Sequence, residues 1–186
     1  CRRRMPGAAS TLLVTLLCWL NSSEPAVAVQ KQTPNFLVTA STRSMATRVA
    51  MAAEAHRREL AVRWLGHEMP RWSSPCHVLV RPGHPRASGA TTFSFQRGEV
   101  FGWQMTLQGP DDEVLESILP HELTHTVLAC RFRRPVPLWA DEGAAVLSES
   151  LSERRRQQRR VLKLFKTGRR IPLGRLLRMS EYPADR

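Results

Sequence analysis

Residues 121–125 read His-Glu-Leu-Thr-His, an H-E-x-x-H pattern that can hold a metal ion and activate water. On a helix, residues four apart lie on one face, so His121 and His125 can direct their imidazoles at one Zn²⁺. Glu122 lies about 100° around the helix from His121, where it can take a proton from metal-bound water as a general base. A chance match in a chain of this composition has a probability of roughly 1 in 80. The pattern therefore predicts a hydrolytic zinc site.

A hydrolytic zinc site needs a third protein ligand and an open position for water. Glu142 is the candidate, because it lies 17 residues after His125, which leaves room for a loop and a return in an antiparallel helix over residues 137–150. The Gly-Ala-Ala sequence of residues 143–145 would let the two helices approach closely. Without the upstream pattern Glu142 would be an ordinary surface glutamate; with it, we expect the third ligand.

The two stretches together resemble the gluzincin metallopeptidases, specifically the bacterial peptidase-MA-like group, in which an H-E-x-x-H helix is followed by a W-x-x-E-G-x-A segment. The matching residues are 119–125 (LPHELTH) and 139–145 (WADEGAA), and the β-rich residues 89–105 are similar to this group's strand region. The resemblance covers about residues 33–186. It implies a zinc metallopeptidase with one Zn²⁺, a peptide or protein substrate that pairs with that strand, the metal ligands His121, His125 and Glu142, and the base Glu122.

Gluzincins also use a Tyr or His to stabilise the oxyanion of the reaction intermediate. The one tyrosine, Tyr182, lies close to residue 186, and no spacing connects His84 to the predicted metal site, so the sequence assigns no such donor. Domains of this group usually continue further, which leads us to expect that the chain ends within its domain. The resemblance also allows Asp141 to orient a ligand imidazole, with capping of a surface helix as the open alternative.

Other kinds of chemistry find less support in the sequence. It contains no G-x-S-x-G nucleophile elbow and no glycine-rich phosphate loop. His56 falls on the apolar side of a predicted helix and is interpreted as a packed core histidine. His67 and His77 lack metal spacing and are interpreted as structural. The cysteines at positions 76 and 130 could form a disulfide or remain as two buried thiols.

Patterns of apolar residues predict the elements that would position these side chains. We expect strands over 35–41 and 76–80, a helix over 44–66 that Ser44 caps and Gly66 ends, and a hairpin over 89–108 with its turn at 97–99. A second helix begins at Asp111, and Pro120 predicts a kink or restart just before His121. This order predicts an α+β fold. The resemblance refines it to a zincin-like fold, a small mixed sheet with a hairpin, packed on an N-terminal helix and an active-site helix pair.

The first 28 residues have the pattern of a secretory signal peptide. Three arginines at positions 2–4 precede an apolar run over 8–20, and Ala26-Val27-Ala28 is a small-x-small cleavage pattern. The apolar run is shorter than the roughly 20 residues that span a bilayer, although an uncleaved anchor is the open alternative. We expect cleavage near Ala28, a single domain over 29–186, and a secreted or periplasmic location, with no transmembrane segment in the mature chain.

Positive charge is concentrated near the end of the chain. The formal net charge is +12, and residues 131–186 carry 15 basic and 6 acidic residues, a net of +9. The strip over 153–160 (ERRRQQRR) is interpreted as a solvated helix face. No aromatic residues interleave with it, which argues against specific nucleic-acid binding. The rival hypothesis is a non-catalytic zinc-stabilised module that binds an anionic envelope polymer through this region.

Overall fold

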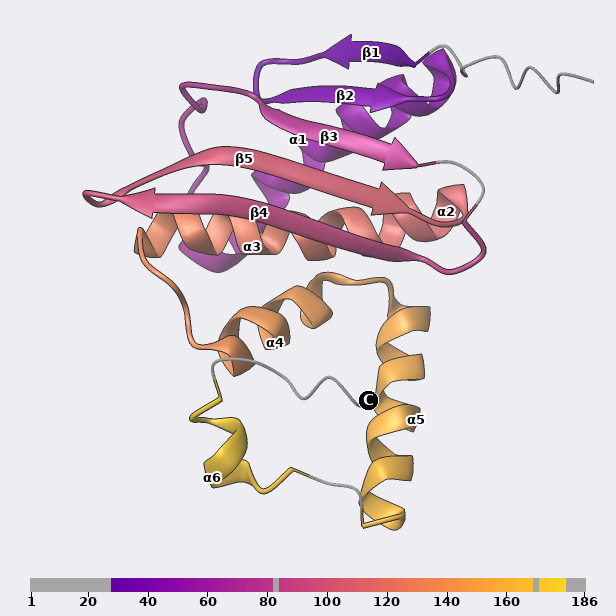
Figure 1. The fold of residues 1–186 in the computed structure, drawn as a ribbon, viewed down its shortest axis with the longest axis vertical. Helices are drawn as coiled ribbons and strands as arrows, with labels where there is room; N and C mark the ends of the chain where they lie inside the picture. The colour runs from indigo at the N-terminus through magenta and orange to yellow at the C-terminus, as the bar shows by residue number, and fades with distance from the viewer. Residues whose placement is uncertain (1–27, 82–83, 169–170, 180–186) are drawn as a thin grey trace, which may run out of the picture.

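The computed structural model describes residues 28–81, 84–168 and 171–179, so the predicted signal peptide up to residue 27 and Tyr182 lie outside the described part. The fold is mixed α+β, as the order of predicted elements indicated (Figure 1). Its elements are β1 (Val29–Gln32), β2 (Phe36–Ala40), α1 (Arg43–Leu65), β3 (Cys76–Arg81), β4 (Ser88–Gln96), β5 (Glu99–Gln108), α2 (Asp111–Glu113), the π-helical η1 (Val114–Ile118), α3 (Leu119–Phe132), α4 (Leu138–Ser148), α5 (Leu151–Lys166) and α6 (Leu173–Leu176).

The five strands form one mixed sheet in the order β1-β2-β3-β5-β4. Strands β2, β3 and β5 run parallel, while β1 and β4 pair antiparallel with their neighbours at the two edges. The parallel pairing of β2 with β3 requires a crossover, and α1 supplies it. Strand β4 is therefore an edge strand, and it is also a strand that contacts α3.

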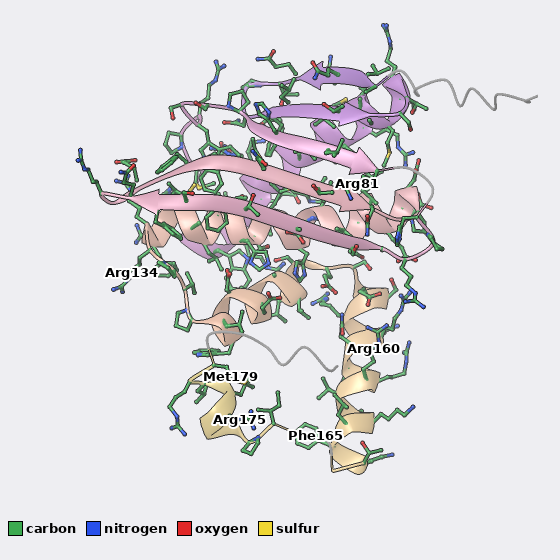
Figure 2. The ribbon with its side chains drawn as sticks, in the orientation of Figure 1. Arg81, Arg134, Arg160, Phe165, Arg175 and Met179 are labelled. Carbon is green, nitrogen blue, oxygen red and sulfur yellow. The ribbon has the colours of Figure 1, made fainter. Side chains whose placement is uncertain are left out.

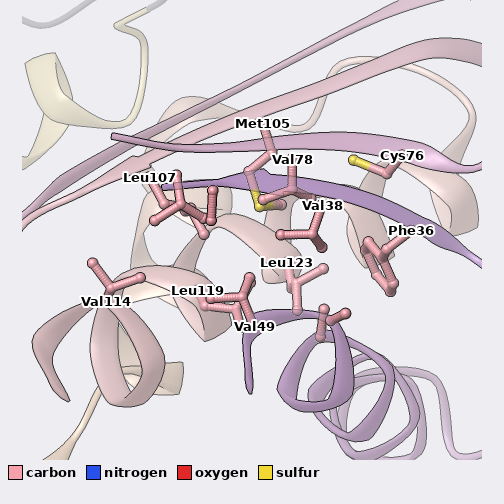
Figure 3. Packing of buried hydrophobic residues seen from close by; sticks show 14 of the residues in the cluster. Phe36, Val38, Val49, Cys76, Val78, Met105, Leu107, Val114, Leu119 and Leu123 are labelled. Carbon is pink, nitrogen blue, oxygen red and sulfur yellow. The ribbon is translucent and has the colours of Figure 1, made fainter. Parts of the chain in front are cut away.

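The hydrophobic core lies between one face of the sheet and the helices α1 and α3 (Figure 3). Alternate residues of β2, β3 and β5 are buried, which is the period expected of strands with one covered face. Their buried side chains include Phe36, Val38, Val78, Met105 and Leu107. Small residues on α1, such as Ala46, Ala50 and Ala53, are fully buried and allow this helix to lie close to its neighbours.

The helical run over residues 111–132 changes its hydrogen-bonding pattern just before the H-E-x-x-H residues. It is π-helical over Val114–Ile118 and returns to α-helix at Leu119, with Pro120 in the first turn of α3. Proline has no backbone N–H to donate to the preceding turn, so a shift of hydrogen-bond register is favoured there. The sequence predicted a kink or a restart near Pro120, and the structure shows a change of hydrogen-bonding pattern there within one continuous helical run.

Two details of the N-terminal region differ from the sequence predictions. Helix α1 begins at Arg43, and its N-cap is Thr42 rather than Ser44, because Thr42 Oγ1 accepts a hydrogen bond of 3.1 Å from the Met45 backbone N–H. The C-cap Gly66 was predicted correctly, with a left-handed φ of 80°. Strand β1 was not predicted, because its sequence Val-Gln-Lys-Gln is mostly polar and exposed and carries no apolar alternation.

The basic strip lies on α5, which has no buried residue and extends away from the layered body (Figure 2). Its labelled residues Arg160 and Phe165 are both exposed. The interpretation as a solvated helix therefore agrees with the structure. Among the residues described, no helix is both long enough and apolar enough to cross a bilayer.

Candidate metal centre

Helices α3 and α4 bring His121, His125 and Glu142 together. Each residue offers a ligand atom, and these atoms all lie within 4.8 Å of one another. The rings of the two histidines are 5.1 Å apart between centroids, as expected of positions four apart on a helix. Glu142 Oε2 lies 3.7 Å from His121 Nε2. Two ligand atoms of a tetrahedral zinc about 2.1 Å from each are separated by about 3.4 Å, so this pair already lies near that distance.

The approach of α4 to α3 depends on a turn and on two alanines. Helix α3 ends at Arg133, which adopts a left-handed conformation with φ of 52°, and the chain re-enters a helix after Pro137. Ala144 and Ala145 are buried between the helices, as small residues must be for close packing. Gly143 does not contribute in the way the sequence suggested, because a Cβ added there would meet no atom within 4 Å.

A carboxylate engages the Nδ1 atom of each histidine. His121 Nδ1 lies 2.7 Å from Glu149 Oε1, within hydrogen-bond distance. His125 Nδ1 lies 3.0 Å from Asp141 Oδ2, close enough for an ion pair although the ring N–H is not aligned as in a regular hydrogen bond. Such contacts favour the tautomer with the proton on Nδ1, which leaves Nε2 of each ring free to bind a metal.

Glu122 lies against strand β4. Its carboxylate Oε2 accepts a hydrogen bond of 2.7 Å from Thr91 Oγ1, and its residue is only 5% exposed. A Cβ added to Gly89 would lie 2.5 Å from Glu122 Oε1, so only glycine allows this approach. Burial raises the pKa of Glu122, while the hydrogen bond from Thr91 and the two histidines oppose that rise.

The electrostatics of the cluster favour a cation. Burial disfavours the charged form of His125, but Asp141, Glu122 and Glu142 outweigh it and raise the pKa of this imidazole. A group of carboxylates that raises the pKa of a buried histidine also attracts a metal dication. Two imidazole nitrogens and one carboxylate oxygen form the His₂Glu donor set of hydrolytic zinc sites. The residues present therefore fit the ion that the sequence predicts.

Several side chains singled out in the sequence lie outside this cluster. His56 packs against the helical run, with its Nε2 3.3 Å from the Leu115 carbonyl oxygen, as a structural histidine would. His84 is exposed, and its Nδ1 lies 3.0 Å from the Arg86 carbonyl oxygen. Cys76 and Cys130 are free thiols, which decides between the two alternatives left open by the sequence. Burial raises the pKa of both thiols.

Three residues at the site were missed by sequence reasoning: Gly89, Thr91 and Glu149. The first two come from the edge strand, and the third from the junction between α4 and α5. No motif marks any of them. An alternating strand beside an H-E-x-x-H helix could have suggested that one face of residues 89–95 lies toward the site, but not which residue contacts Glu122.

Comparisons of the chain with models of protein families, with curated proteins and with solved structures found no match. The class of protein is therefore inferred from the fold and the site. What they define is an α+β domain with an exposed edge strand, a buried glutamate beneath it, and a His-His-Glu group between two helices.

Proposed function

We propose that this chain is a zinc-dependent metallopeptidase of the gluzincin type, with a zincin-like fold. The observation that carries the proposal is the convergence of His121, His125 and Glu142 within 4.8 Å, with Glu122 beside them. The three ligands come from two helices, and each imidazole has a carboxylate at Nδ1. Structural zinc sites usually use four protein ligands, whereas three ligands leave a position for water.

In this proposal, different residues of the chain have separate roles in peptide hydrolysis. His121, His125 and Glu142 would hold the ion, which when bound supplies Lewis acidity toward a carbonyl and lowers the pKa of water. Glu122 takes the proton of the attacking water and passes it to the leaving amine. A carboxylate whose pKa is raised by burial suits both halves of that transfer, because it holds a proton more readily than an exposed one.

Strand β4 supports a peptide as the substrate class. It lies at the edge of the sheet with one side unpaired among the described strands, and it contacts the helix that carries Glu122. An extended peptide could add to this edge through backbone hydrogen bonds, which recognise any sequence. On the same strand, Gly89 leaves the space that Glu122 occupies, and the hydroxyl of Thr91 donates a hydrogen bond to the Glu122 carboxylate. The secretory signal predicted over residues 1–28 makes an extracytoplasmic location part of the proposal.

The test compares the full chain with Glu122→Gln and Glu142→Ala. Bound zinc is measured by elemental analysis, and hydrolysis by release of fluorescence from labelled casein. We expect one zinc per wild-type chain, retained in Glu122→Gln with hydrolysis lost, and weakened or lost in Glu142→Ala. Glu116→Gln, an exposed glutamate on the same helical run, is the matched control and should behave as wild type. Zinc-free folded wild type would overturn the proposal.

A second candidate function rests on the exposure of α5. This helix carries five arginines and no buried residue, so its charge is free to contact an anionic polymer. In that case the metal group stabilises the fold without catalysis. Binding to heparin that weakens steeply with salt and is unchanged in Glu122→Gln, together with no casein hydrolysis, would favour this function over the first.

A further inference from the structure

Three consecutive residues at the α4–α5 junction contact successive turns of the helical run formed by η1 and α3, which carries both histidines. The hydroxyls of Ser148 and Thr124 lie 2.8 Å apart, Glu149 Oε1 lies 2.7 Å from His121 Nδ1, and the hydroxyls of Ser150 and Ser117 lie 2.8 Å apart. Positions 117, 121 and 124 are separated by four and three residues, so they form one face of that helix. We call residues 148–150 the junction clasp.

The middle contact of the junction clasp is unusual for a carboxylate. The side chain of Glu149 is only 5% exposed, and among the described residues its sole ion-pair partner is His121. Its second oxygen, Oε2, is buried and has no hydrogen-bond partner among the described residues. Burying a carboxylate without a Lys or Arg partner is costly. Such a residue needs a compensating role, and its contact with a predicted metal ligand indicates which one.

We infer that Glu149 is a positioning residue that fixes the ring of His121 for metal binding. By accepting a hydrogen bond from Nδ1–H of His121, Glu149 leaves Nε2 without a proton, 3.7 Å from Glu142 Oε2. The hydroxyl contacts on either side hold the end of α4 against the histidine helix, and therefore hold Glu142 relative to His121. This inference rests on the proposed metal centre, but it assigns a role to a residue that no part of the H-E-x-x-H or W-x-x-E-G-x-A patterns contains.

The two carboxylates that contact the Nδ1 atoms of the histidines should differ in their effect on metal affinity. Asp141 is 26% exposed at its side chain, so water can replace its contact with His125. Glu149 is buried, so nothing replaces its contact with His121. Carboxylates that orient a ligand histidine typically contribute 10-fold to 100-fold to metal affinity. We expect Glu149 to lie at the upper end of that range and Asp141 at the lower end.

The experiment measures zinc affinity by competition with a chromophoric chelator, on the full chain and on Glu149→Gln, Glu149→Ala and Asp141→Asn. Glu149→Gln keeps an oxygen acceptor for Nδ1 but loses the charge, and we expect affinity to fall about 10-fold. Glu149→Ala loses both and should fall about 100-fold. Glu153→Gln is the matched control, because the side chain of Glu153 is only 15% exposed but pairs with Arg156, and the zinc affinity of this variant should equal that of wild type.

Thermal unfolding in the presence of a chelator separates positioning from a general effect on folding. Without metal, Glu149→Gln should unfold at or above the wild-type temperature, since it removes an uncompensated buried charge. Equal zinc affinity in wild type and both Glu149 variants would overturn this inference while leaving the metal centre in place. The inference would also be overturned if the zinc affinity of Glu149→Gln fell only in proportion to a loss of thermal stability measured without metal. A wild-type chain that binds no zinc would overturn the metal centre and this inference together.

Discussion

Gly89 on the edge strand β4 should be intolerant of any side chain. A Cβ at this position would lie 2.5 Å from Glu122 Oε1, 2.6 Å from Glu122 Cγ and 2.7 Å from Ile118 Cγ2. The φ of Gly89 is not in the left-handed region, so its conformation does not require glycine. The requirement is the space that Glu122 occupies, which makes Gly89→Ala a direct probe of whether β4 lies against Glu122, the proposed general base.

The size of the effect follows from these distances. Non-bonded carbon atoms are most favourably separated by about 3.5 Å, so β4 or the Glu122 side chain must move by about 1 Å to admit the methyl group. Overpacking of this kind typically costs about 1–3 kcal/mol of folding free energy. A displacement of about 1 Å at a catalytic group can also lower the rate about 100-fold. We therefore expect Gly89→Ala to be destabilised by about 2 kcal/mol and to lose most of its hydrolytic activity.

The assay combines urea unfolding, zinc content and casein hydrolysis. The matched control is Gly143→Ala, which adds the same methyl group beside Glu142, the proposed metal ligand, at a position where the added Cβ would meet no atom within 4 Å. In a helix this change should be neutral or stabilising by up to about 1 kcal/mol. Wild-type stability and rate in Gly89→Ala would refute the reasoning, because the methyl group would then have found space that the structure does not provide.

Further predictions concern a hydrogen bond, a helix cap and a buried thiol. Thr91→Val removes the hydroxyl that donates to Glu122 and should cost about 1–3 kcal/mol in urea unfolding, whereas Thr91→Ser should retain it. Thr42→Ala should cost about 1 kcal/mol, with Ser44→Ala near neutral if the cap is as observed. Burial raises the pKa of Cys76 from 9.0 to about 12. Between these values the unfolded chain releases a proton that the folded chain keeps, so stability should fall by up to about 1.4 kcal/mol per pH unit. Urea unfolding at pH 8 and pH 10.5 should show this loss in wild type and a smaller loss in Cys76→Ala, in which Cys130, whose pKa burial also raises, remains.

The elements that the sequence predicted correctly are those whose signal is local and strong. The hairpin over 89–108 alternates clearly and has Arg97 and Gly98 at its turn, both with positive φ. The change of hydrogen-bonding pattern near Pro120 follows from a missing backbone N–H. Strand β1 gave no such signal, because it is held by backbone pairing with β2 and not by burial of its side chains. The cap at Thr42 could not be told from Ser44, because two hydroxyl residues lie close together in the sequence and either suits the position.

In the candidate site, too, the residues predicted from the sequence are those placed by local helical geometry, and the residues that were missed are distant in sequence from their contacts. The positions of His121 and His125 follow from helical geometry alone, and Glu142 needs only one turn between two helices. Glu149 and Thr91 lie 28 and 31 residues from the side chains they contact. Their places depend on how the α4–α5 junction and the edge strand pack against α3, which spacing within one helix does not determine.

These distant residues also strengthen the case for a cation. A five-residue pattern can occur by chance, but burying Glu122 and Glu149 on either side of His121 is costly. Among the described residues, neither carboxylate forms an ion pair with Lys or Arg. Many basic residues of this strongly basic chain are exposed, as on α5, and the buried Arg57 donates to the backbone carbonyls of Met69 and Pro70. Because neither buried carboxylate pairs with a Lys or Arg among the described residues, a cation bound nearby would offset the cost of burying them, and the His-His-Glu group has the donors to hold a metal dication.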